Sequence, residues 1–267
     1  MTDFKSEPNR PGDPEDLPRS QFEDAAPVRR EPIINAPGIV ILLAVVLLAI
    51  HAALEFLPVN TSNWIRYSMA FVVQRYMPAD MFIGGILPPG GELARYTSFV
   101  SYSLLHGSWT HLILNIVWML AFGSVAARRL GAGRFLFLSA LAAAIAATFS
   151  LVIAWGTETI LVGASGAIAG QVAVAIRLIF SHGGTLSTGL RKDLTHIPPE
   201  PLLRLFTNKS AVIFIAIWLG VDIVSASSGL LTDARVAWEA HLGGFLTGLL
   251  LFGHLDPHNH KAGETTG

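Results

Sequence analysis

Long runs of apolar residues, separated by polar segments, dominate the pattern along this chain. Six such runs follow residue 37, at 38–57, 109–127, 135–155, 161–180, 211–230 and 236–254. Each has about the 20 residues that a helix needs to cross roughly 30 Å of hydrocarbon. The alternation of apolar and polar residues expected of a barrel strand is absent, and a backbone in lipid must satisfy its own hydrogen bonds. The pattern predicts an all-α membrane protein, a bundle of six transmembrane helices.

The polar segments divide the chain into three regions. Residues 1–37 are rich in proline and charge and predict a disordered cytoplasmic tail, followed by the membrane domain at 38–254. Residues 255–267 predict a short C-terminal cytoplasmic tail. His254, directly before this tail, and Asp256, His258 and His260 within it favour a solvated segment over a weak metal site. The long loop 58–108 is either an amphipathic segment in the membrane interface or an ordinary structured loop.

Composition agrees with a membrane protein. The chain is 52% hydrophobic and 14% charged, with a mean hydropathy of +0.52, whereas soluble domains carry about 25% charged residues. A formal net charge of −1 gives no reason to expect nucleic acid as a partner. The chain has no cysteine, which excludes disulfides, a thiol nucleophile and thiolate-bound zinc. We expect no cofactor and no metal.

The basic residues predict the orientation in the membrane. If both tails are cytoplasmic, only four of the 18 Lys and Arg residues lie outside: Arg66, Arg75, Arg95 and Arg235. The positive-inside rule favours that arrangement. Together with the absence of a recognisable targeting signal, it predicts a multi-pass protein of a bacterial inner membrane.

Four polar side chains stand out inside the apolar runs. His111 and Asn115 lie on the second run, Ser165 on the fourth and His241 on the sixth. With this topology all four are expected at one shallow level, roughly 3–9 Å below the outer boundary. Each alone has a structural explanation: a serine lets helices approach, an asparagine joins helices, and a histidine can be a hydrogen-bonded interior group. Their convergence favours a functional site.

The four residue types fit nucleophilic catalysis. Serine is a weak nucleophile until a base removes its proton, and neutral imidazole suits that role near pH 7. Attack on a carbonyl develops an oxyanion that needs donors already in place. His111 and Asn115 are four residues apart, so they project from one helical face. Ser165, near the start of its helix, adds its own N–H.

Small residues flank the two candidate catalytic groups. Gly163 and Gly166 lie beside Ser165, and Gly244 and Gly248 lie on the same helical face as His241. Gly166 with Gly170 and Gly244 with Gly248 both have the G-x-x-x-G spacing that lets helix backbones approach closely. Three further polar residues predict interhelical hydrogen bonds or exposure to a cavity: Gln171, Asp222 and Glu239.

These motifs resemble those of the rhomboid family. The string from His106 to Asn115 resembles the family's His-x-x-x-Asn motif preceded by a further histidine, and Gly163–Ala167 resembles its G-x-S-G motif. Ala240–Gly248 resembles its A-H-x-x-G-x-x-x-G motif, and Glu92 with Arg95 resembles the start of the segment before the second helix. The resemblance covers about 92–254.

The resemblance implies an intramembrane serine endopeptidase with a Ser–His dyad and no acidic third member. It implies that Ser165 is the nucleophile, that His241 is the base, and that His111 and Asn115 bind the oxyanion. The expected substrates are single-span membrane proteins, cut at a site that opens to the outer face. Two departures weaken the match: Ala94 replaces a frequent Trp, and Ala169 replaces an aromatic residue that stacks on the catalytic histidine.

Two other functions remain open. A proteolytically silent relative would bind membrane proteins as a scaffold, but such relatives typically lack the serine or the histidine. A small transporter would also bury polar groups, but the chain shows no inverted repeat. The sequence does not predict the oligomeric state.

Overall fold

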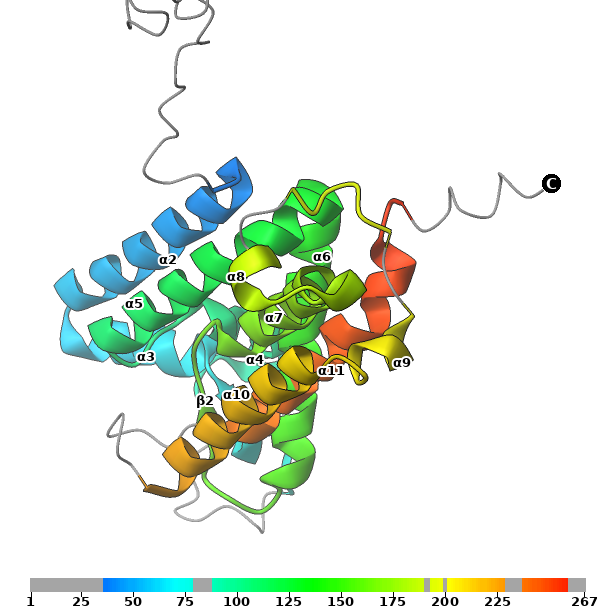
Figure 1. Ribbon diagram of the computed structural model, residues 1–267. Helices are drawn as coiled ribbons and strands as arrows, with labels where there is room; N and C mark the ends of the chain where they lie inside the picture. Colours follow the sequence, from blue (N-terminus) through cyan, green and yellow to red (C-terminus); the bar gives the residue numbers. More distant parts are fainter. Residues whose placement is uncertain (1–35, 79–87, 190–192, 199–200, 229–236, 259–267) are drawn as a thin grey trace, which may run out of the picture. The chain divides into compact units, whose positions relative to one another are not determined.

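The computed structural model describes residues 36–78, 88–189, 193–198, 201–228 and 237–258, and in that part of the chain it is mostly helical (Figure 1). The longer helices are α2 (Gly38–Phe56), α3 (Val59–Met69), α4 (Gly91–Ser101), α5 (Trp109–Trp118), α6 (Ser124–Ile153), α7 (Ser165–Ile179), α10 (Lys209–Ser228) and α11 (Trp238–Leu255). Short elements are the 3₁₀ turns η2 (Val73–Tyr76), η4 (Tyr102–Leu104) and η6 (Ser181–Gly183), the π-helix η5 (Met119–Gly123), α8 (Leu186–Gly189) and α9 (Leu202–Leu205).

Each of the six predicted apolar runs contains helix in its described part, but the fourth run, predicted from 161, becomes helical only at Ser165. Among the described residues, two stretches are long and apolar enough to cross a membrane: α2, and the continuous run α5–η5–α6 from Trp109 to Ile153. Helix α7 is apolar but shorter. The predicted tail at 1–37, apart from residues 36 and 37, lies outside the described residues, as do residues 259–267.

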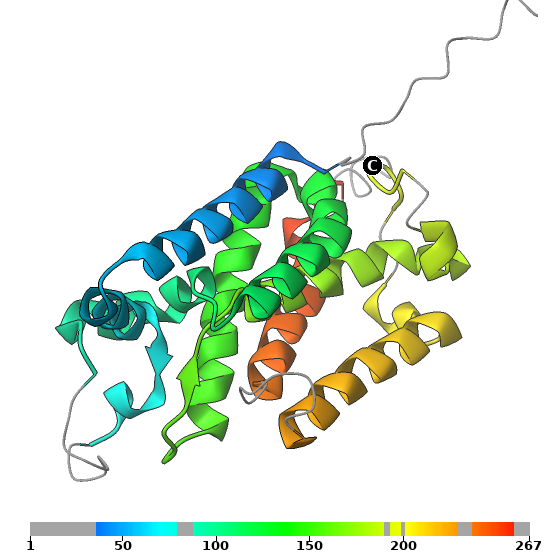
Figure 2. The ribbon, with the colours of Figure 1, turned by 90° about the vertical axis from the view of Figure 1, so that its left-hand side faces the viewer.

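Helix α2 shows why these helices suit lipid. Its buried residues recur every three or four positions and so form one face: Val40, Ala44, Leu47, His51 and Leu54. The opposite face is also apolar, with Leu42 and Val45 more than half exposed. Figure 2 shows α2 at the edge of the bundle beside α5, and the exposure of Leu42 and Val45 means that the described part of the chain leaves this outer face uncovered. In water such a face would be unfavourable, whereas hydrocarbon is its natural solvent.

The sequence predicted a break between the second and third apolar runs, and the chain breaks there at Gly131. This residue has φ 74° and ψ 165°, which divides α6 into two helical segments. Positive φ is costly for side chains with a Cβ, so glycine suits the position. The break lets the two segments run in different directions without a long loop.

Helices α6, α7 and α11 form the tightly packed centre of the bundle (Figure 1). A Cβ on Gly244 would collide with the carbonyl oxygen of Gly166, and one on Gly248 would collide with that of Gly170. The backbones of α7 and α11 therefore touch, as the two G-x-x-x-G motifs predicted. Every residue of α7 after Ser165 is buried.

The loop 58–108 is structured wherever it is described, and whether it lies in the membrane interface stays a prediction. It contains α3, η2, α4 and strand β1 (Phe71–Val72). Strand β1 pairs antiparallel with β2 (Ile160–Leu161), with Phe71 opposite Leu161 and Val72 opposite Ile160. The loop is thereby attached to the residues just before α7.

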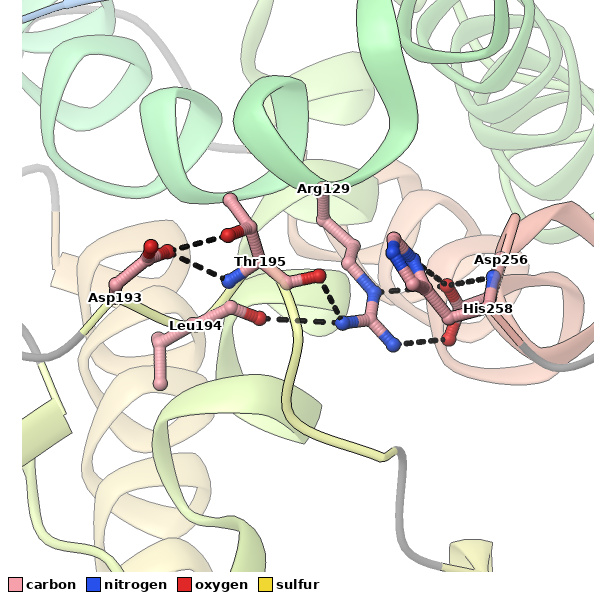
Figure 3. Close-up of polar contacts among 6 residues, drawn as sticks. All are labelled: Arg129, Asp193, Leu194, Thr195, Asp256 and His258. Carbon is pink, nitrogen blue, oxygen red and sulfur yellow. Dashed lines mark hydrogen bonds and ion pairs between the residues drawn. The ribbon is translucent and has the colours of Figure 1, made fainter. Parts of the chain in front are cut away.

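An ion pair anchors the far end of α11. Arg129 donates from Nε and Nη2 to the two carboxylate oxygens of Asp256, both at 2.8 Å, and from Nη1 to the carbonyls of Leu194 and Thr195 (Figure 3). Both charged side chains are almost completely buried. The expectation that Asp256 belongs to a solvated tail is therefore wrong, because the Arg129 guanidinium holds it inside.

Candidate active site

Ser165 is the first residue of α7 and not, as predicted, several residues inside a helix that begins at 161. Residues 160–161 form β2 instead, and Gly163 has φ 116°, a left-handed conformation that ends the extended segment. Ser165 therefore lies at a helix N-terminus, where backbone N–H groups have no partner within the helix. Its side chain is partly exposed, whereas its neighbours Ala164 and Gly166 are buried.

His111 lies against the turn that precedes Ser165. A Cβ on Gly163 would be 2.6 Å from Cε1 of His111 and 2.8 Å from Nε2. The ring thus packs on the backbone two residues before the serine, and only glycine leaves room for it. The start of α5 is fixed by Ser108, whose Oγ accepts a hydrogen bond of 3.2 Å from the His111 N–H.

Asn115 follows His111 by one helical turn and is buried. Its Nδ2 donates to the carbonyl oxygen of His111 at 2.8 Å. An amide has two N–H groups, so one donor remains after this bond. The pair occupies one face of α5, as the spacing predicted.

His106 was noticed in the sequence only as part of the motif, and the structure gives it a position at the site. It lies just before α5 and is buried, with its ring 5.2 Å from that of His111. Its Nε2 accepts a long hydrogen bond of 3.5 Å from the N–H of Ala164. Burial, with a smaller effect from His111, lowers the pKa of His106 to about 3. The ring is therefore neutral at physiological pH.

His241 is the fourth residue of α11 and lies opposite the start of α7. Gly166, next to Ser165, faces the carbonyl oxygen of Ala240, next to His241. Between Ser165 and His241, both of which are described, the structure has no hydrogen bond. Catalytic hydrogen bonds are often long before substrate binds, so Ser165 and His241 both remain candidates for a catalytic pair.

The Nδ1 atom of His241 has a partner that the sequence did not assign to it. Oδ2 of Asp222, on α10, lies 2.7 Å away. The ring of Trp218, also on α10, is 6.3 Å from the ring of His241 at an interplanar angle of 29°. Trp218 was missed altogether, although its position four residues before Asp222 places both on one helical face.

The predicted interhelical hydrogen bonds are confirmed for all three polar residues. Gln171 donates to Ser139 on α6 at 3.0 Å, and Glu239 accepts from Ser150 on α6 at 3.2 Å. The third is the bond of Asp222 with His241. The two departures from the family pattern, Ala94 and Ala169, are both buried.

No cluster of three or more His, Cys, Asp or Glu residues within the described part of the chain could hold a metal ion. The site instead combines Ser165 at the start of α7, His241 near the start of α11, and the side chains of His111 and Asn115 on α5. That set is suited to acyl transfer in a helical membrane protein.

The comparison with family models gives the family. A model of the rhomboid domain matches residues 93–255, well over half of the chain. The chain therefore belongs to the rhomboid family, and membership together with the apolar helices indicates a membrane protein. Among curated proteins no sequence match is found.

Proposed function

We propose that this protein is an intramembrane serine endopeptidase that cleaves membrane-anchored proteins. The observation that carries the proposal is the position of Ser165 at the N-terminus of α7, with His111 packed against Gly163 two residues earlier. Members of the rhomboid family are generally serine proteases of this kind. A nucleophile beside oriented donors is what that reaction needs.

In the proposed reaction Ser165 Oγ attacks the carbonyl carbon of the scissile peptide bond, and Nε2 of His241 takes the hydroxyl proton. His111, the second N–H of Asn115 and the Ser165 backbone N–H stabilise the oxyanion. The C–N bond then breaks as the imidazolium gives its proton to the leaving nitrogen. Water attacks the resulting ester, loses a proton to His241, and the serine leaves with its proton restored.

The proposed setting is a six-span bundle, at 38–254, with both termini in the cytoplasm and the site near the outer face of a bacterial inner membrane. Helices α2, α5–η5 with the first part of α6, the second part of α6, α7, α10 and α11 provide the six spans. The basic residues support the orientation. The substrate would be a single transmembrane segment reaching the site from the bilayer, and no cofactor is required.

The test compares the purified full-length protein with its Ser165→Ala and His241→Ala variants in liposomes that contain single-span model substrates. Cleavage by the wild type and none by either variant supports the proposal. Equal cleavage by wild type and Ser165→Ala would remove Ser165 from the reaction. A folded wild type that binds these substrates without cutting any of them would favour the silent scaffold.

A further inference from the structure

We infer that Asp222 is a positioning residue that holds His241 in the tautomer and orientation of a general base. The inference rests on the proposed function and deepens it, because the resemblance to the rhomboid family implies a dyad without an acidic member. It adds a third residue, from α10, to a site otherwise built by α5, α7 and α11.

The geometry of the pair is that of a strong hydrogen bond. The distance between Nδ1 of His241 and Oδ2 of Asp222 is 2.7 Å, and the two side chains are 14% and 17% exposed. A bond of this length with an ionised acceptor is at the strong end of the range. Partial burial keeps water from competing for either group.

The consequence for catalysis follows from the hydrogen-bond inventory. An ionised carboxylate only accepts, so neutral His241 must carry its proton on Nδ1 when it bonds to Asp222. The lone pair is then on Nε2, the nitrogen that takes the serine proton. Without Asp222 the neutral ring can place its proton on either nitrogen, and one of the two tautomers cannot act as a base towards Ser165.

A second contact from α10 fixes the same ring. Trp218 lies one turn before Asp222, and its ring faces that of His241 with 6.3 Å between centroids, within the range of interacting aromatic pairs. Trp218 is itself packed against Phe245 on α11, at 5.3 Å. Helix α10 therefore holds His241 at one edge with Asp222 and over one side with Trp218.

These contacts account for a departure seen in the sequence. Ala169 provides no aromatic ring to stack on His241, so the support expected from α7 is missing. The small side chain of Ala169 is buried in the zone where α7 meets Gly244 of α11. In this chain the support for the histidine comes from α10.

A purely structural role for Asp222 makes a different prediction. If the bond only joined α10 to α11, its loss would lower stability and leave the chemistry of the remaining folded molecules unchanged. If Asp222 positions His241, the turnover number falls in protein that remains folded. His241 and His51 both act electrostatically on His111 of α5, and the Asp222 variants below leave all three histidines unchanged.

The test uses the full-length protein in liposomes, with Asp222→Asn, Asp222→Ala and Asp222→Glu. The control is Val221→Ala, the neighbouring position on α10, whose side chain is 51% exposed. We expect Asp222→Ala and Asp222→Asn to lower kcat by at least about tenfold at nearly unchanged KM, since an orienting acid contributes up to about 10⁴-fold in soluble serine hydrolases. Asp222→Glu should recover part of the loss, and the control should match wild type.

Nitrogen NMR of ¹⁵N-histidine-labelled protein gives a readout that does not need a substrate. Wild type should show neutral His241 protonated on Nδ1, assigned by the signal lost in His241→Ala, and Asp222→Ala should shift that proton towards Nε2. An active wild type whose Asp222→Ala variant keeps both kcat and the tautomer would overturn the inference alone. A wild type that cleaves nothing and has the Nε2–H tautomer would overturn the proposed function and the inference together.

Discussion

The carbonyl oxygen of Gly166, the residue after Ser165, occupies the space that a Cβ on Gly244 would need. Helices α7 and α11 are thus in backbone contact beside the two proposed catalytic residues. A single added methyl group at this point must separate the helices, because the obstructing atom belongs to the backbone and cannot rotate away.

We expect Gly244→Ala to destabilise the fold by about 1–3 kcal/mol or more, the usual cost of overpacking, and to lower activity as Ser165 and His241 move apart. The matched control is Gly133→Ala on α6, where an added Cβ meets nothing within 4 Å. There the change should be neutral or slightly stabilising, since alanine favours a helix. Melting temperatures in detergent compare the two, and equal values would contradict the packing described.

The buried ion pair between Arg129 and Asp256 makes a second prediction. Removing one member leaves the other charge buried without its partner, which costs about 3–5 kcal/mol. Arg129→Met and Asp256→Leu should each lower the melting temperature strongly. The double variant should lose less than the sum of the single losses, because neither charge is then left alone. Strict additivity of the two losses would mean that the pair does not interact.

His106 predicts how stability depends on pH. Its folded-state pKa is about 3, while an unfolded histidine has a pKa near 6.5. As the pH falls below about 6.5 the unfolded state takes up a proton that the folded state refuses, so stability decreases between about pH 6.5 and 3. His106→Gln should make the melting temperature less sensitive to pH in this range. If the melting temperature of His106→Gln depends on pH as steeply as that of wild type in this range, the assignment of the pH dependence to His106 is refuted.

Asn115 tests the proposed oxyanion site. Asn115→Ala removes a preplaced donor, and losing one such donor typically costs about 10²–10³ in kcat. Leu114→Ala, the preceding position with a 50% exposed side chain, provides the control. A kcat for Asn115→Ala within a factor of two of wild type, in folded protein, would exclude Asn115 from the oxyanion site.

The apolar runs predicted where the helices lie because the need for apolar side chains in hydrocarbon applies to each segment of the chain separately. Any segment crossing hydrocarbon must be apolar over about 20 residues, so the runs mark the helices without knowledge of their neighbours. The start of α7 was placed too early because Ile160 and Leu161 are as apolar as a helix interior. Their pairing with Phe71 and Val72 depends on a segment about 90 residues earlier in the chain.

The candidate residues were predicted from residue types and spacing, but the support of His241 was not. Helix α10 is apolar on most of its surface, so its pattern does not indicate which side faces α11. Only the packing of the helices shows that Trp218 and Asp222 point towards the histidine. The burial of Asp256 was also missed, because it depends on the folded position of Arg129, which lies 127 residues away in the sequence.

The central claim is that Ser165 is a nucleophile activated by His241, and covalent labelling tests it most directly. The purified protein is treated with a fluorophosphonate, which reacts with activated serine hydroxyls, and the adduct is located by mass spectrometry of peptides. The account predicts one adduct, on Ser165, that is absent from Ser165→Ala and strongly reduced in His241→Ala. A folded wild-type protein that remains unlabelled at Ser165, or that is labelled equally in His241→Ala, would contradict it.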